Sequence, residues 1–152
     1  MEKVILTLIM VISSVTGYAQ ENKNPFLLDW TGPYGGVPQF QNYTLNDLKP
    51  AIEYAIDEKL NEISKIANNS EAATFFNTIE ALEKIGKKFN QIYAIFGIYS
   101  SNMNSPEFEP IETEMTPKFS EVSNKFYQNT KLFARISTIY NSKEIKALSP
   151  EQ

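Results

Sequence analysis

The chain has 152 residues, a formal net charge of −4 and a pI near 4.9, and 42% of its residues are hydrophobic. This composition is typical of one soluble domain of ordinary size. The chain contains no Cys and no His, which excludes most protein ligands for zinc, copper, haem iron and iron–sulfur clusters, and also the commonest general base. The acidic balance gives no basic surface for a phosphate backbone, so no nucleic-acid partner is expected.

Residues 1–19 have the pattern of a secretory signal peptide. Lys3 forms a short basic start, an apolar run follows from Val4 to Val15, and small residues precede a cleavage position after Ala19. The apolar run is too short to span a bilayer, although a buried strand or an amphipathic helix is the alternative interpretation. The pattern predicts a periplasmic or secreted product that begins at Gln20 and has no membrane contact after cleavage.

Residues 20–46 form a Pro- and Gly-rich segment, which predicts an extended lead-in with turns. Five large apolar side chains make this segment too hydrophobic for a free tail, and we expect them to be buried against a helical body. They are Phe26, Leu27, Trp30, Tyr34 and Phe40. No Gly-rich phosphate-binding spacing occurs in the chain.

Helical periodicity begins near Asp47. Apolar residues at three- and four-residue steps predict a helix over 47–68, with Pro50 in its first turn. A second helix is predicted over 75–100, with Thr74 as its N-cap. The second half of this helix, from Ile92 to Tyr99, is apolar on nearly its whole circumference and therefore requires neighbours on every side.

A third helix is predicted to start at Ser105-Pro106-Glu107 and to kink or break near Thr116, because Pro117 follows. Its inward stripe contains Phe108, Ile111, Met115, Phe119, Val122 and Phe126. A fourth helix is predicted over 130–140 with Asn129 as its cap. Its predicted inward residues are Leu132, Phe133, Ile136, Ile139 and Tyr140.

Ser149-Pro150-Glu151 repeats the helix-start signal of Ser105, but the sequence stops one residue later. A start signal without its helix, together with a helix apolar on all sides, predicts that the helical domain of residues 47–152 is truncated at its C-terminus.

No side-chain constellation in the sequence predicts catalysis, so we assign no catalytic, cofactor-binding or metal residue. Glu107, Glu109, Glu112 and Glu114 form the densest acidic cluster. These carboxylates could serve as a cation site or an acid–base pair, but we interpret them as a solvated acidic helix start that complements the helix dipole. A Ser nucleophile would need a Lys base, and no S-x-x-K spacing occurs. For Arg135, the single Arg, we expect a local ion pair or a carbonyl contact.

Several short runs in fixed order resemble the N-terminal region of the peptidyl-dipeptidase and oligopeptidase A branch of the thimet-oligopeptidase-like zinc metallopeptidases. The two most specific runs are Thr74-Phe75-Phe76-Asn77-Thr78-Ile79-Glu80-Ala81-Leu82 and Leu132-Phe133-Ala134-Arg135-Ile136. The others are Asn24-Pro25-Phe26-Leu27, Trp30, Pro38-Gln39-Phe40, Pro50-Ala51-Ile52, Gly86, Phe96, Thr116-Pro117, Tyr140 and Leu148-Ser149-Pro150-Glu151-Gln152.

The resemblance covers essentially the whole mature chain, with two departures. Phe76 stands where the family usually has Glu, and no His occurs from Asn46 to Lys49, before Pro50. The resemblance implies a large helical enzyme whose two halves enclose a deep channel for short peptides. It also implies zinc in the parent enzyme, held by an H-E-x-x-H helix, and that motif is absent from this sequence.

We therefore predict an all-α fold of about four helices after the extended lead-in. The predicted function is that of an N-terminal fragment of a zinc-dependent peptidyl-dipeptidase, inactive alone because the catalytic half is missing, with a structural role in the channel wall. Two alternatives stay open. One is a freestanding periplasmic helical module that binds or interacts without catalysis, and the other is a non-functional gene remnant.

Overall fold

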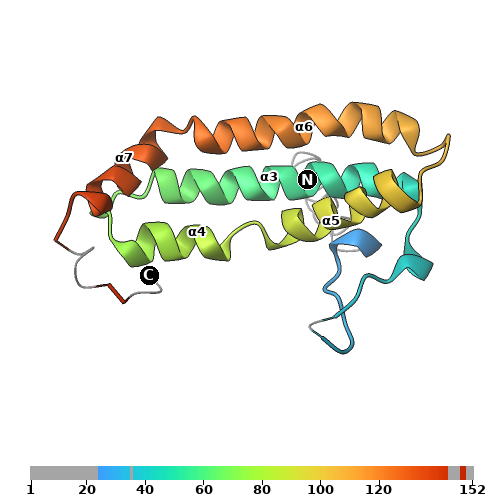
Figure 1. The fold of residues 1–152 in the computed structure, drawn as a ribbon, viewed down its shortest axis with the longest axis horizontal. Coiled ribbons are helices and arrows are strands. Elements are labelled where there is room, and N and C mark those ends of the chain that lie inside the picture. Colours follow the sequence, from blue (N-terminus) through green and yellow to red (C-terminus); the bar gives the residue numbers. More distant parts are fainter. Residues whose placement is uncertain (1–23, 35, 144–147, 150–152) are drawn as a thin grey trace, which may run out of the picture. The chain divides into compact units, whose positions relative to one another are not determined.

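The computed structural model describes residues 24–34, 36–143 and 148–149 (Figure 1). The predicted signal peptide and the predicted helix start at Pro150 lie outside these residues. The chain divides into two compact units, residues 1–51 and 52–152. Across the described ranges the secondary structure is helical, apart from a single antiparallel bridge between Thr31 and Val37. The predicted all-α class is confirmed.

The first unit contains two short 3₁₀-helices, η1 (Pro25–Leu27) and η2 (Phe40–Asn42), and the first residues of the helix α3. Asn24 connects these parts. Its side-chain oxygen accepts from the Phe26 amide at 3.0 Å, and its Nδ2 donates to the Asp47 carbonyl at 2.8 Å. Phe26 is fully buried and stacks on Tyr43, with ring centroids 4.1 Å apart.

The turn within the lead-in differs from the prediction at one residue. Tyr34 is fully exposed and has a positive φ of 59°, so the expectation that it is buried is wrong. Turn geometry explains this, because the chain reverses between the bridged residues Thr31 and Val37 and the turn points the ring into solvent. Gly36 is required here, since a Cβ on it would lie 2.5 Å from the Trp30 carbonyl oxygen.

The helix α3 (Leu45–Ala67) confirms the first predicted helix but begins two residues earlier. Pro50 therefore lies in the second turn and not in the first. Its missing N–H leaves the Asn46 carbonyl without a helical donor, and both residues are exposed, so water can supply the bond.

The second predicted helix is two pieces. A π-helical turn η3 (Phe75–Glu80) continues into α4 (Ala81–Lys84), and α5 (Lys87–Asn102) follows after a break. Ile85 is extended and Gly86 adopts a left-handed conformation with φ 78°. The predicted continuous helix over 75–100 is therefore wrong. The helix ends at Lys84 because Gly86, two residues later, takes the left-handed conformation that commonly ends a helix.

The predicted N-cap of this segment is confirmed. The Thr74 hydroxyl accepts from the Asn77 amide at 3.2 Å, and the Asn77 side-chain oxygen accepts from the Thr74 amide at 2.9 Å. These two bonds form a reciprocal capping box.

The helix α6 (Glu109–Tyr127) starts later than predicted, after a turn over 106–108 whose Phe108 amide donates to the Ser105 hydroxyl at 3.3 Å. Pro117 lies inside α6, which is one continuous helix, so of the predicted kink or break near Thr116 the break does not occur. Pro117 and Thr113, whose carbonyl loses its donor, are both exposed, and solvent replaces the lost bond. The Thr116 hydroxyl also donates to the Glu112 carbonyl at 2.7 Å.

The helix α7 (Thr130–Tyr140) has the predicted bounds and the predicted Asn129 cap. Two of its predicted inward residues point outward, since Phe133 is 69% exposed and Tyr140 is 71% exposed. They lie on one side of the buried stripe of Leu132 and Ile139, and Arg135 occupies an inward position instead.

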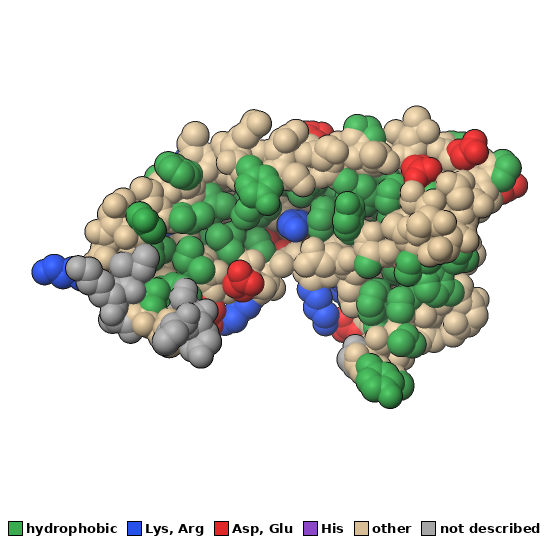
Figure 2. Space-filling view, viewed as in Figure 1, with side chains coloured by type: hydrophobic (Ala, Val, Ile, Leu, Met, Phe, Trp, Pro, Cys, Tyr) green, Lys and Arg blue, Asp and Glu red, His purple; other side chains and the backbone are tan. Residues whose placement is uncertain are grey.

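The second unit has two packing regions. Near α7, the buried core contains Ile63, Ile66, Ala67 and Leu132, with partly buried Leu60, Ala81, Leu82, Ile85, Phe126 and Ile136 around it. Figure 2 shows hydrophobic side chains gathered over α3, α4 and α6 on this face. The other region is aromatic and joins α5 to α6. Among the described residues, no helix has the length and apolarity needed to cross a membrane.

Candidate functional site

Among the described residues of the second unit, Arg135 is a buried polar side chain with several hydrogen-bond partners. It is 8% exposed and donates four hydrogen bonds. Its Nη1 bonds to the carbonyls of Asn69 at 2.9 Å and Glu71 at 3.0 Å, its Nε to the Thr78 hydroxyl at 3.2 Å, and its Nη2 to Asn77 Oδ1 at 2.7 Å. Arg135 thus makes carbonyl contacts, as predicted, but with residues distant in the sequence and not with local ones.

The Arg135 network joins the two sequence runs that resemble the peptidase family most specifically. Asn77 and Thr78 come from the T-F-x-N-T run, and Arg135 comes from the L-F-x-R-I run. Asn77 Oδ1 also accepts from Thr78 Oγ1 at 3.0 Å, and Asn77 Nδ2 donates to the Ala72 carbonyl at 2.9 Å. Because four neutral oxygens satisfy the buried guanidinium, the network fixes α7 against the 69–78 segment. This role is structural, and no reacting group lies in the network.

Phe76, the residue that departs from the family pattern, lies on η3 directly before Asn77, but its side chain points away from the core. Its side chain is 66% exposed. The departure therefore changes a surface position and leaves the Arg135 network intact.

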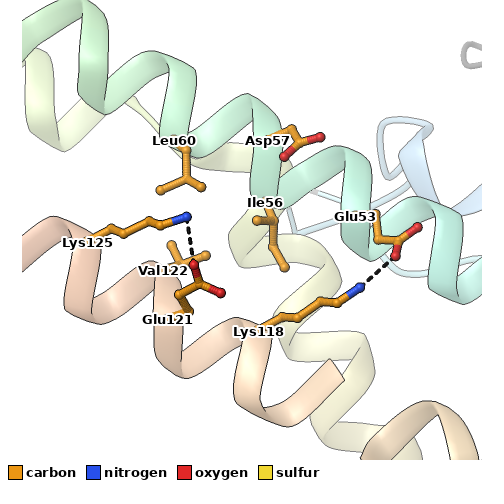
Figure 3. Close-up of a pocket in the computed structure, with 8 residues that line it drawn as sticks. All are labelled: Glu53, Ile56, Asp57, Leu60, Lys118, Glu121, Val122 and Lys125. Atoms are coloured by element: carbon orange, nitrogen blue, oxygen red, sulfur yellow. Dashed lines mark hydrogen bonds and ion pairs between the residues drawn. The ribbon is translucent and has the colours of Figure 1, made fainter. Parts of the chain in front are cut away.

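A charged groove of about 370 Å³ lies between α3 and α6 (Figure 3). Lys118 Nζ reaches from α6 to Glu53 on α3 at 2.7 Å, and the apolar side chains of Ile56, Leu60 and Val122 lie between the two helices. The hydrogen bond to Glu53 is the main reason that the pKa of Lys118 is raised. Opposite charges therefore pair within the groove, and this arrangement is typical of a stabilised helix contact.

An aromatic groove of about 610 Å³ lies between α5 and α6. Phe119 of α6 is its centre, and the rings of Phe89, Tyr93 and Phe96 surround it with centroid separations of 5.6, 5.1 and 5.0 Å. Phe89, Phe96 and Phe119 are buried, but Tyr93 is 56% exposed and forms an open wall.

The polar end of the aromatic groove contains Glu112. Its carboxylate accepts a hydrogen bond from the Ser100 hydroxyl and one from Asn104 Nδ2 at 3.5 Å. Among the described residues that line this groove, Glu112 is the only Asp, Glu, Lys or Arg.

The acidic cluster predicted around the start of α6 is dispersed by the structure. The hydroxyl of Ser105 bonds to Glu107 and lowers its pKa, Glu112 faces Ser100 on α5, and Glu114 lies 3.6 Å from Lys118. Within the described ranges no three acidic side chains come together as a possible metal site. With no His or Cys in the sequence, the residues present do not fit a zinc ion, and no catalytic step can be assigned to them.

Sequence reasoning missed the Asn77–Thr78–Arg135 contact and the exposed groove. Arg135 stood out as the single Arg, but its partners lie 57 or more positions away in sequence, and no periodicity reports such a pairing. For the groove, the available signal was the charge-free segment of residues 89–106.

Comparison with known proteins identifies two similar chains. The sequence is 30% identical over 128 residues to the dipeptidyl carboxypeptidase of Escherichia coli (strain K12) and 27% identical over 128 residues to that of Salmonella typhimurium (strain LT2). Each match covers 84% of this chain and 19% of the relative, so the chain spans about a fifth of the length of these curated relatives. No family model matches the chain. The predicted resemblance to the peptidyl-dipeptidases is confirmed.

Proposed function

We propose, starting from the confirmed similarity to the dipeptidyl carboxypeptidases, that this chain is the N-terminal helical segment of an exported zinc-dependent peptidyl-dipeptidase. The parent reaction is removal of dipeptides from the C-termini of short peptides. In this segment the role is structural, as part of the wall of the peptide channel. Zinc and the catalytic residues would belong to the remaining four-fifths of such an enzyme, because this sequence lacks His.

The observation that carries the proposal is the 128-residue match together with the Arg135 network. The two most family-like runs are far apart in sequence, and they bond to each other through Asn77, Thr78 and Arg135. A hydrogen-bonded contact between two helices of this kind fits a framework role in such an enzyme.

Segment replacement tests the proposal. Residues 20–152 would replace the matching segment of the Escherichia coli relative, and hydrolysis of a blocked tripeptide would be measured with zinc present. We expect activity in the replacement enzyme and none in residues 20–152 alone. Stoichiometric zinc binding by residues 20–152 alone, or a correctly folded but inactive replacement enzyme, would contradict the proposal.

The export prediction is tested separately. N-terminal sequencing of the protein recovered from a bacterial periplasm should start at Gln20. A chain recovered from the cytoplasm with Met1 intact would contradict it.

A freestanding periplasmic binding module remains the second candidate, and the open aromatic groove between α5 and α6 favours it. The purified chain would then melt cooperatively as a monomer and would bind short peptides by isothermal calorimetry. The fragment proposal instead expects binding of a hydrophobic dye and a tendency to aggregate.

A further inference from the structure

We propose that one further helix packs into the aromatic groove between α5 and α6. This helix is supplied by the part of a dipeptidyl-carboxypeptidase-like chain that lies beyond the matched segment. The proposal rests on the proposed function, because it takes its occupant from the rest of such an enzyme.

The first argument is the arrangement of the three helices that pack together in the second unit. Ring contacts join α5 to α6, the Lys118–Glu53 pair joins α6 to α3, and Lys59 of α3 lies 4.2 Å over the ring of Phe89 on α5. The α3 helix contributes no residue to the lining of the aromatic groove. The groove is thus on the side of the α5–α6 pair where a fourth helix would complete a four-helix bundle.

The second argument is the shape of the groove. Phe108, near the start of α6, contacts Phe96 and Tyr99, whereas Phe119 contacts Phe89 and Tyr93, so α5 and α6 run antiparallel. The lining on α5 extends from residue 89 to residue 100, which corresponds to about 16 Å of helix. A long furrow between two antiparallel helices accepts the side-chain ridge of a third helix better than it accepts a small molecule.

The third argument is charge. The chain is 21% charged, but residues 89–106 contain no Asp, Glu, Lys or Arg. After its first two residues, Lys87 and Lys88, the exposed residues of α5, such as Asn90, Ala94, Gly97 and Ser101, are uncharged. The Ser101 hydroxyl is bonded to the Gly97 carbonyl at 2.7 Å, which makes this face less polar still. A solvated helix face normally carries charge, so this face is suited to an apolar partner.

The fourth argument selects the occupant. The dipeptidyl carboxypeptidases are about five times the length of the matched segment, since the match covers 19% of them. Glu112 adds a chemical requirement, because it is the single carboxylate at one end of an otherwise uncharged groove. The helix that fills the groove should therefore be apolar on the face that contacts the groove and should have one Lys or Arg opposite Glu112.

Cysteine labelling tests the proposal, and the absence of native Cys gives a clean background in this chain. Ser120→Cys and Asn90→Cys place thiols on the two walls of the groove, both at exposed positions. Ser64→Cys, exposed on α3 and outside the groove lining, is the matched control for Ser120→Cys. Maleimide labelling rates are measured in the 152-residue chain and at the aligned positions of a Cys-free Escherichia coli relative.

We expect both groove thiols to react quickly in the 152-residue chain and at least about ten-fold more slowly in the relative. Ser64→Cys reports the intrinsic rate and the folded state in each background. Two groove positions are used so that the result does not depend on the folding of one variant.

Three results would overturn the proposal. Groove thiols that react equally fast in the relative show that no helix covers the groove. Slow labelling in the 152-residue chain with a doubled mass by light scattering identifies a second copy as the occupant. Slowing in the relative that appears only when a short peptide is added identifies bound peptide. Labelling needs no catalysis, so an inactive replacement enzyme would contradict the proposed function without changing this result.

Discussion

Replacement of Arg135 by Met is the most direct test of what holds α7 in place. Met keeps much of the length of the side chain but removes the charge and all four hydrogen bonds. The carbonyls of Asn69 and Glu71 and the side-chain oxygens of Asn77 and Thr78 then lose a donor in a region where Arg135 is only 8% exposed.

The expected loss follows from two opposing terms. A hydrogen bond from a charged group contributes about 1.5–3 kcal/mol, so four such bonds contribute about 6–12 kcal/mol. Burial of the guanidinium costs several kcal/mol, and Arg135→Met removes that cost as well. The net loss is therefore well below that sum, and we expect the free energy of unfolding to fall by about 2–4 kcal/mol, the range usual for a broken buried polar network.

Urea unfolding followed by far-ultraviolet circular dichroism measures this loss. With a urea dependence of about 1–3 kcal/mol per molar, the midpoint should fall by about 1–2 M. Lys131→Met on the same helix is the control, because its single 2.6 Å bond to Asn68 lies on the surface and its loss should change the free energy of unfolding by about 0.5 kcal/mol or less.

The reasoning would be refuted if Arg135→Met lowered the midpoint no more than Lys131→Met does. A second check is a double-mutant cycle of Arg135→Met with Asn77→Ala. The effects of two side chains that share a 2.7 Å bond should not add. Strict additivity would show that the bond contributes nothing to stability.

Three further predictions concern single side chains and are measured by the same unfolding assay. Gly86→Ala should destabilise the chain by about 1 kcal/mol, because φ is 78° and the new Cβ would lie 3.3 Å from a lysine side chain of α3. Gly97→Ala should stabilise it by about 0.5–1 kcal/mol, because Gly97 lies inside α5 with open space around it. Equal effects of the two substitutions would contradict the backbone argument. Phe119→Ala should lower the free energy of unfolding by about 3–5 kcal/mol, because three rings contact Phe119. Phe133→Ala should lower it by about 0.5 kcal/mol or less, because the Phe133 side chain is 69% exposed. A larger loss for Phe133→Ala would support the prediction that this residue points inward. Burial raises the pKa of Glu58, so ionisation of its carboxyl opposes folding as pH rises from about 4.5 through the raised value. The Glu58→Gln chain should therefore have a higher melting temperature than the parent chain at pH 7, and the two melting temperatures should be equal at pH 3.5.

Helix positions were predictable from the sequence because apolar periodicity and capping residues act locally. The cap residues Thr74 and Asn129 each have the predicted hydrogen bonds, and α7 has the predicted bounds. The break at Gly86 had a local signal as well, since Gly follows Lys84 by two residues, but the apolar stripe continues in phase across it and conceals the interruption.

Side-chain direction was less predictable, because hydropathy alone does not decide which residues of a helix face the core. Phe133 is more hydrophobic than Arg135, yet Arg135 is buried and Phe133 is exposed. The reason is non-local, since the 69–78 segment offers four oxygen acceptors that only a cation with several N–H groups can satisfy together. Nothing in the residues next to Arg135 encodes those acceptors.

The helix α5 has more apolar surface than its packing against α3 and α6 buries. From its sequence, the segment from Ile92 to Tyr99 was expected to need neighbours on all sides, and the structure covers Ile92, Ile95, Phe96 and Tyr99 while Tyr93 stays 56% exposed. Exposing an uncharged helix face with an aromatic wall gives no stability to an isolated domain and increases its tendency to associate. Such a face is useful only when another surface covers it. The mismatch between sequence and burial therefore favours a framework segment that is completed by further helices over a module built to stand alone in water.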